Sequence, residues 1–179
     1  MLERKAPPVS NIQHLASNIS MLLIDGNNLI GNRIHSAASL SAARKTLLEE
    51  LARYTRIKKK KVTVVFDGMP EINIADGSSY RSVKVFYGGD GSDADTRILK
   101  LVENQSNKAI LTVITTDGAL SAKVKMYGVK TMKAGAFRNL LQEVEDVVER
   151  EDDFQMNDMD QWMRYFGVDE SDDEVGSDE

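Results

Sequence analysis

The chain has 179 residues, enough to bury an ordinary hydrophobic core in one domain with extensions. It contains no cysteine, which excludes disulfide bonds and thiolate metal sites. No apolar run approaches the roughly 20 residues that cross a bilayer, so no membrane association is expected. The start of the chain lacks the continuous apolar segment of a signal peptide, and a cytoplasmic protein is expected.

The net charge of −5 is unevenly distributed along the chain. Residues 141–179 hold 16 acidic and 2 basic side chains, whereas residues 1–140 hold 12 acidic and 21 basic ones, a net charge of +9. A basic body favours a polyanionic partner. The acidic end is typical of disordered chain, with one candidate helix at 154–167. This tail is expected to contact a basic partner or the protein's own basic surface, or to aid solubility.

Apolar segments alternate with amphipathic ones along most of the chain. Strands are predicted at 21–25, 62–66, 82–87, 109–116 and 129–132, and helices at 39–57, 92–105, 118–128 and 136–149. A turn is expected at 25–28 and a loop at 69–81. Because strands and helices alternate, the sequence predicts an α/β fold with a parallel sheet covered on both faces.

Three of the predicted strands run into an aspartate. Asp25 closes MLLID, Asp67 closes VTVVFD and Asp117 closes ILTVITTD, while Asp95 lies where the helix after the 82–87 strand should begin. Ligands of open parallel sheets bind beyond the carboxyl ends of the strands. These four side chains are therefore expected to converge at one edge of the sheet.

Clustered carboxylates favour a bound cation. Two ionised carboxylates about 5 Å apart repel by roughly 3 kcal/mol at an effective dielectric near 20. Oxygen ligands without cysteine or a well-placed histidine favour Mg²⁺ or Mn²⁺ over zinc. Such an ion can activate water and stabilise charge on a phosphate, which indicates phosphodiester hydrolysis.

Each aspartate also has a purely structural interpretation. Asp25 and Asp67 precede glycine, as turn residues often do. Asp117 can cap the helix that follows it. Asp95 can be the third position of a capping box opened by Ser92. These four structural interpretations are less favoured than a shared metal site, because all of them would have to hold at the same sheet edge.

The order of these motifs resembles that of the YacP-like family, in the NYN branch of PIN-like ribonucleases. DGNNLIG at 25–31 resembles the family's opening, VFD at 65–67 its second strand, AD at 94–95 and TTD at 115–117 its later acidic motifs, and 128–141 its closing strand and helix.

The resemblance implies a three-layer α/β/α sandwich with a central, mainly parallel sheet. It also implies an endoribonuclease that uses Mg²⁺ or Mn²⁺ held by Asp25, Asp95 and Asp117, with Asp67 as a further catalytic residue. The family is associated with RNA cleavage and ribosome-linked mRNA decay, so RNA is the expected partner.

The same resemblance sets the expected domain boundaries. An N-terminal extension would occupy residues 1–19, the PIN-like NYN domain residues 20–149, and the acidic tail residues 150–179. The chain departs from the family pattern at Asn27, where an aromatic or small residue is common, and in its acidic tail.

Candidate phosphate contacts follow strand ends, as the carboxylates do. Asn28 and Arg33 come after the first strand, and Lys133 and Arg138 after the last. Asn28 is equally interpretable as a turn asparagine.

Two further basic features are less easily placed. The run 58–61 precedes a strand and so belongs to the sheet edge away from the carboxylates. A solvated helix end, favoured by the helix dipole, is its preferred interpretation, with a distal RNA contact as the alternative. Arg81, in the loop before the 82–87 strand, is another candidate for phosphate binding.

Other functions compete with hydrolysis of RNA. A degenerate PIN-like domain that binds RNA or the ribosome without cutting it is the main alternative, although all four acidic positions are filled. HAD-type phosphatases need Asp-x-Asp after the first strand, where this chain has Asp25-Gly26-Asn27. Toprim enzymes need a glutamate there, and dinucleotide enzymes need GxGxxG; both are absent.

Overall fold

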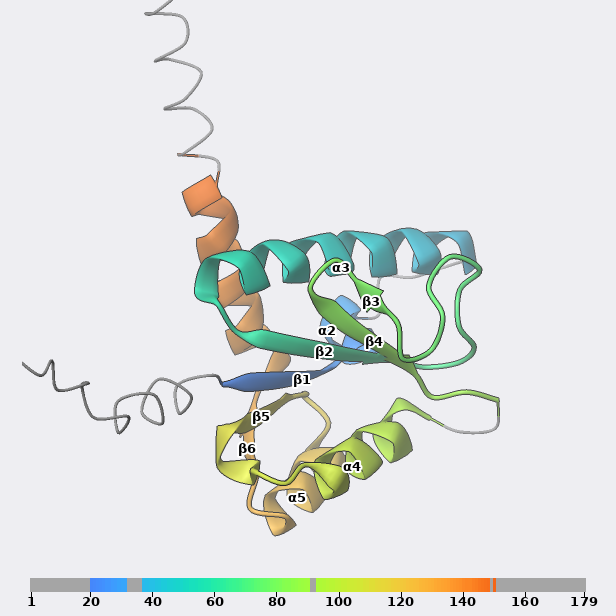
Figure 1. Cartoon of the computed structure of the whole chain (residues 1–179), viewed down its shortest axis with the longest axis vertical. Coiled ribbons are helices and arrows are strands. Elements are labelled where there is room, and N and C mark those ends of the chain that lie inside the picture. Colours follow the sequence, from blue (N-terminus) through green and yellow to red (C-terminus); the bar gives the residue numbers. More distant parts are fainter. Residues whose placement is uncertain (1–19, 32–36, 91–92, 149, 151–179) are drawn as a thin grey trace, which may run out of the picture. The chain divides into compact units, whose positions relative to one another are not determined.

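The computed structural model describes residues 20–31, 37–90, 93–148 and 150. Its strands are β1 (Met21–Asp25), β2 (Lys61–Phe66), β3 (Ser79–Tyr80), β4 (Val83–Tyr87), β5 (Leu111–Ile114) and β6 (Lys130–Met132). Its helices are α2 (Gly26–Ile30), α3 (Ala37–Lys58), α4 (Ala94–Asn104), the 3₁₀ turn η3 (Lys108–Ile110), α5 (Gly118–Met126) and a last helix at 134–148 (Figure 1). The sheet, the helices α2 to α5 and the last helix as far as Val144 belong to one compact unit.

The strands form one sheet in the order β3-β4-β2-β1-β5-β6. Every pairing is parallel except that of the two-residue β3 with β4. The predicted α/β fold with a mainly parallel sheet is therefore confirmed. Strand β1 pairs with β2 on one side and β5 on the other, so the strand order reverses at β1. A crevice beyond the carboxyl end of β1 is where such sheets bind ligands.

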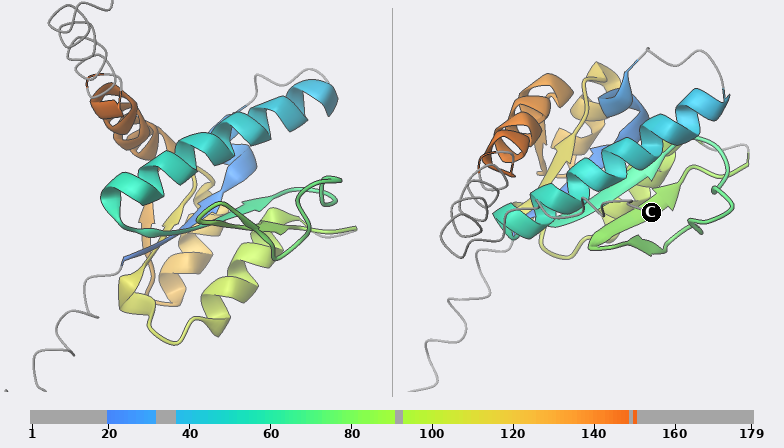
Figure 2. Two further views of the ribbon diagram at one scale, coloured as in Figure 1. Left: turned by 45° about the horizontal axis from the view of Figure 1, so that its top comes forward. Right: turned by 90° about the horizontal axis from the view of Figure 1, so that it is seen from above.

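The sheet is buried on both faces because side chains alternate along each strand. In β1, Leu22 and Ile24 pack with α2, α3 and the last helix, whereas Leu23 packs with α4 and α5. Figures 1 and 2 show α3 on one face of the sheet and α4 with α5 on the other. Phe137 of the last helix meets Tyr54 of α3 edge to face, with ring centroids 5.2 Å apart. The result is the three-layer sandwich that the family resemblance implied.

The structure differs from the sequence-based prediction in short elements. Residues 26–30 form a helix rather than a turn. The predicted loop at 69–81 contains β3, which is too short to show a pattern. The strand expected from residue 109 begins only at Leu111, because η3 precedes it.

Gly26 explains why α2 fits against the sheet. A Cβ built at this residue would lie 2.4 Å from Phe66 Cε1 and 2.9 Å from Val64 Cγ2. Both neighbours are fully buried core side chains. Glycine follows Asp25 here because α2 approaches β2 closely, rather than because of a turn.

Some expectations fall beyond the described residues. The extension at 1–19, the tail at 151–179 and its candidate helix at 154–167 all lie there, so the domain boundaries stay a prediction. Among the described residues, none of the helices has the length and apolarity needed to cross a membrane.

Candidate active site

Asp25 is the last residue of β1, the strand at which the strand order reverses. Its Oδ1 accepts a hydrogen bond from the Asn28 backbone N–H at 3.1 Å and so caps α2. Its Oδ2 accepts one from the Thr115 hydroxyl at 3.0 Å. The residue is only 6% exposed. The pKa of Asp25 is raised to about 6, mainly by burial and to a lesser extent by the charges of Asp95 and Asp67, against the lowering effect of the two hydrogen bonds.

Asp67 connects the end of β2 to the start of α4. Its Oδ1 accepts a hydrogen bond of 2.8 Å from the Ala94 backbone N–H. Asp93 caps the same helix by accepting from the Thr96 N–H at 2.8 Å. Ser92, the residue of the alternative capping-box interpretation, lies outside the described residues. Two carboxylates thus hold the first turn of α4, and Asp95 lies in that turn.

Asp95 is the second aspartate of the site, after Asp25, whose pKa is raised. Burial raises its pKa, and the charges of Asp117, Asp93 and Asp67 raise it further, whereas Lys123 lowers it. Asp95 therefore lies within electrostatic reach of acids that follow both β2 and β5. The four predicted aspartates are thus brought to one edge of the sheet.

Asp117 follows β5 and caps α5. Its Oδ1 accepts a hydrogen bond of 2.6 Å from the Leu120 N–H, so the capping interpretation of this residue is confirmed. Capping does not exclude ion binding, because a carboxylate has about four lone-pair sites and these bonds occupy only part of them. Asn28 Oδ1 accepts from the Thr116 N–H at 3.0 Å and ties α2 to this loop.

The chemistry and charge of this edge fit a divalent cation. All of the nearby carboxyl oxygens are hard ligands, and the pKa values of Asp25 and Asp95 are raised first by burial and then by the charge of neighbouring carboxylates, so a cation would stabilise their ionised forms. Within the described residues, however, no three His, Cys, Asp or Glu side chains are close enough to enclose an ion. Electrostatic coupling between the carboxylates is compatible with this spacing, because charges interact over longer distances than the roughly 2.1 Å of a Mg²⁺–oxygen bond. Direct ligation by three carboxylates would require them to move closer together.

The predicted phosphate contacts have different surroundings. The sheet edge with Asp25, Asp67, Asp95 and Asp117 is called the acidic edge below. Arg138 donates a hydrogen bond to the Leu29 backbone oxygen and lies against Gly31, so it supports the end of α2 beside this edge. Lys133 is exposed directly after β6. Arg33 lies outside the described residues.

Sequence reasoning missed Thr115 as a site residue. Its hydroxyl donates to Asp25 and also accepts from the Asp117 N–H at 3.1 Å. One buried oxygen therefore joins two of the acidic residues. The sequence feature that could have identified Thr115 is its position as a polar residue directly after the mostly apolar segment of β5.

Arg44 is the second residue that was missed. It is buried in α3 and stacks over Phe66 with its guanidinium carbon 5.1 Å from the ring centroid. Its Nη2 donates to the Asp67 backbone oxygen at 2.5 Å, and its Nη1 lies 3.4 Å from Glu71 Oε1. Arg44 thus fixes the main chain at Asp67. The sequence does contain a sign of this role: Arg44 lies four residues before Leu48, so a charged residue falls on the apolar face of the predicted helix.

The fold and this edge together define a class of protein. A mainly parallel α/β/α sandwich with aspartates gathered beyond β1, β2 and β5 is a PIN-like fold. The model of the YacP-like NYN domain family matches residues 22–169. The chain belongs to this family, which confirms the resemblance seen in its motifs.

Solved structures agree with this assignment. A tryptophan-to-leucine variant of Rae1 (YacP) from Bacillus subtilis is 27% identical over 74% of this chain and 80% of that chain, with a TM-score of 0.62. Another crystal structure of Rae1 (YacP) from Bacillus subtilis shares the fold, with 24% identity over 83% and 88% of the two chains and a TM-score of 0.66. A comparison with curated proteins gave no match. Membership of a PIN-like nuclease family supports a ribonuclease role with RNA as the substrate.

Proposed function

We propose that this protein is a metal-dependent endoribonuclease that hydrolyses RNA phosphodiester bonds. Asp25, Asp95 and Asp117 would hold Mg²⁺ or Mn²⁺, and Asp67 would assist them. The observation that supports this most strongly is the gathering of the four carboxylates at one edge, where burial and, to a lesser extent, their mutual charge raise the pKa of both Asp25 and Asp95. Such coupled carboxylates are typical of functional sites.

The bound ion would stabilise charge on the phosphate and lower the pKa of a water molecule. The protein's own groups position the acids around it. Thr115 fixes the orientation of Asp25, and the Arg44 guanidinium fixes the backbone at Asp67. Since Thr115 and Arg44 are buried, they would keep Asp25 and the Asp67 backbone at this edge while the carboxylates move the remaining distance toward the ion.

RNA would reach the acidic edge past polar and basic residues that follow β1 and β6 in the sequence. Lys133 and Arg138 follow β6, while Asn28 and Arg33 follow β1, and we propose that they contact phosphate. These contacts would offset the repulsion between the carboxylates and the RNA backbone. Cytoplasmic RNA processing or ribosome-linked mRNA decay is the proposed setting.

One observation favours a second candidate function. The described residues contain no three His, Cys, Asp or Glu side chains close enough to enclose an ion. A PIN-like module that binds RNA or the ribosome without cutting it would need no such cluster. Its weakness is that four aspartates at the edge would repel a bound phosphate backbone and contribute nothing to affinity.

Cleavage assays separate these functions. Labelled RNA and DNA would be incubated with the wild type and with Asp25→Asn, with added Mn²⁺ and then with EDTA. We expect the wild type to cut RNA only with the cation, and Asp25→Asn to lose turnover by orders of magnitude. Glu103→Gln removes an exposed charge at the far end of α4 and serves as the control. Undiminished turnover in Asp25→Asn would remove this residue from the mechanism.

A further inference from the structure

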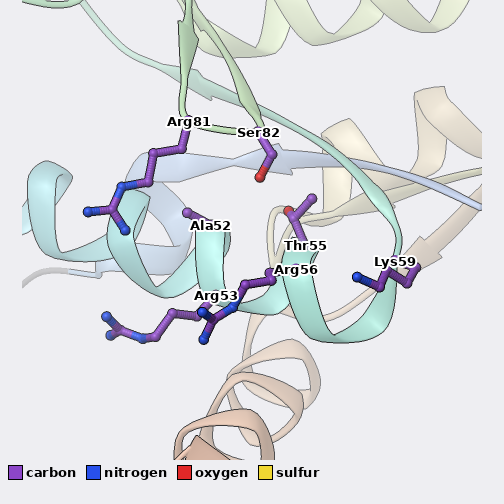
Figure 3. Close-up of a pocket in the computed structure, with 7 residues that line it drawn as sticks. All are labelled: Ala52, Arg53, Thr55, Arg56, Lys59, Arg81 and Ser82. Carbon is purple, nitrogen blue, oxygen red and sulfur yellow. The ribbon is translucent and has the colours of Figure 1, made fainter.

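A second charged site lies around the end of α3. A pocket of about 490 Å³ is lined there by Arg53, Thr55, Arg56 and Lys59 from α3 and the residue after it, and by Arg81 and Ser82 between β3 and β4. Figure 3 shows that these side chains come from two segments separated in sequence. Four of them are cationic and none is acidic. Lys59 of the basic run 58–61 and Arg81, which the sequence presented as separate features, therefore line the same pocket.

The cations of this pocket are largely uncompensated. Within the part of the chain that the structure describes, Arg56, Lys59 and Arg81 make no ion pair. All three are exposed. The like charges of these three residues repel one another, so the arrangement is stabilised when an anion binds. Arginine supplies paired donors that match two phosphate oxygens.

The backbone supports these side chains in an unusual conformation. Lys59 has φ 54° and Arg81 has φ 51°, and among the described residues they are the only non-glycine residues with positive φ. Such conformations are uncommon for residues with a Cβ and gather at ligand-binding sites. Both of them line this pocket.

The pocket is distinct from the acidic edge. Lys59 precedes β2 and Ser82 precedes β4, so the pocket lies at the amino ends of these strands, whereas Asp67 follows the carboxyl end of β2. The length of β2 separates the two edges by roughly 17 Å. One phosphate group cannot contact both sites, but a chain of phosphates can.

We propose that this pocket, which we call the distal basic pocket, binds the phosphate backbone of RNA away from the cleavage site. The inference rests on the proposed RNA substrate and deepens it. A long RNA would be anchored at the distal basic pocket while another part of it reaches the acidic edge. The pocket thereby favours long or structured RNA over short fragments.

The test measures binding without turnover. The affinity of the full chain for a long labelled RNA would be measured by fluorescence anisotropy in EDTA over a series of salt concentrations. The pocket variant is Arg56→Gln with Arg81→Gln. The matched control, Lys45→Gln with Lys100→Gln, removes the same charge from exposed positions elsewhere. Circular dichroism and melting temperature establish that both variants are folded.

We expect the pocket variant to lose about tenfold in affinity at low salt and the control about twofold or less. The slope of log affinity against log salt should fall by about 1.4, because two phosphate contacts of about 0.7 each are removed. Equal losses in both variants would show an effect of net charge alone and overturn the proposal. Unchanged or tighter binding by the pocket variant would also overturn it.

The assay is independent of catalysis. Asp25→Asn should not weaken binding of the long RNA, even though it is expected to abolish cleavage. If the protein cuts no RNA but the pocket variant loses affinity, the proposed hydrolysis fails and the distal basic pocket stands. If cleavage depends on Asp25 but the pocket variant binds RNA normally, the proposed hydrolysis stands and the distal basic pocket fails.

Discussion

The Thr115 hydroxyl donates a hydrogen bond of 3.0 Å to Asp25 Oδ2 across 90 positions of sequence. The same oxygen accepts from the Asp117 N–H, so it fixes two acidic residues that follow neighbouring strands. Because the bond lies in the buried part of the site, it lowers the pKa of Asp25 against the effect of burial. Thr115 is therefore a positioning residue for the acidic edge.

Replacement of Thr115 tests this positioning role. Thr115→Val removes the hydroxyl without changing the volume of the side chain, and leaves the Asp117 N–H without its acceptor. We expect the pKa of Asp25 to rise and the free energy of unfolding to fall by about 1–3 kcal/mol. The activity profile should shift to higher pH and kcat should fall, as measured by cleavage rates over a pH series. Thr115→Ser keeps the hydroxyl and should restore the profile; equal profiles for the Val and Ser variants would contradict the role.

The pH dependence of stability follows from the raised pKa of Asp25. Its pKa is about 6 in the folded protein against 3.8 for the unperturbed group, so the folded state binds more protons between these values. The stability that Asp25 contributes is fully present below pH about 4 and is lost as the pH rises through about 6.

Asp25→Asn should therefore stabilise the protein at neutral pH while abolishing turnover. The shift corresponds to roughly 3 kcal/mol, and we expect a gain of about 1–3 kcal/mol because asparagine loses part of the bond to Thr115. Urea denaturation at pH 4 to 7.5 measures the difference between variant and wild type. That difference should grow with pH and level off above about pH 6.5; a difference independent of pH would show that Asp25 is not a buried, titrating group.

Divalent cations should stabilise the folded protein. A ligand that binds only the folded state at ten times its Kd contributes about 1.4 kcal/mol, which raises the melting temperature by about 3–5 °C for a chain of this size. Thermal melts with Mg²⁺ or Mn²⁺, and again after EDTA, measure the effect. Asp25→Asn should lose the increase and Glu103→Gln should keep it. An unchanged melting temperature in the wild type would favour the alternative function, a PIN-like module that binds RNA without cutting it.

Gly26 and Gly118 provide a matched pair of tests, since each follows an aspartate that caps a helix. Gly26→Ala would place its Cβ 2.4 Å from the buried Phe66 ring, and we expect a loss of about 1–3 kcal/mol or more. Gly118→Ala meets no atom within 4 Å, so alanine should be neutral or stabilising by up to about 1 kcal/mol. Denaturant midpoints compare the two; similar values would show that α2 does not pack against β2 as described.

The sequence by itself determined the strands, the major helices and the position of an aspartate after three of the strands. These features are local, because apolar periodicity and an abrupt polar residue are visible in a few consecutive positions. The family motifs extended this to the class of fold. The short helix α2 escaped prediction because the geometry that selects it, close packing of Gly26 on Phe66, involves β2 and not the neighbouring sequence.

Only the tertiary structure decided which residues meet. The strand order places β1 between β2 and β5, and that order brings Thr115 to Asp25 and Asp67 to the start of α4. It also joins Arg56 of α3 to Arg81 in a single pocket. Such contacts depend on how buried faces of distant segments pack together, and a repeating pattern within one segment carries no information about its partner.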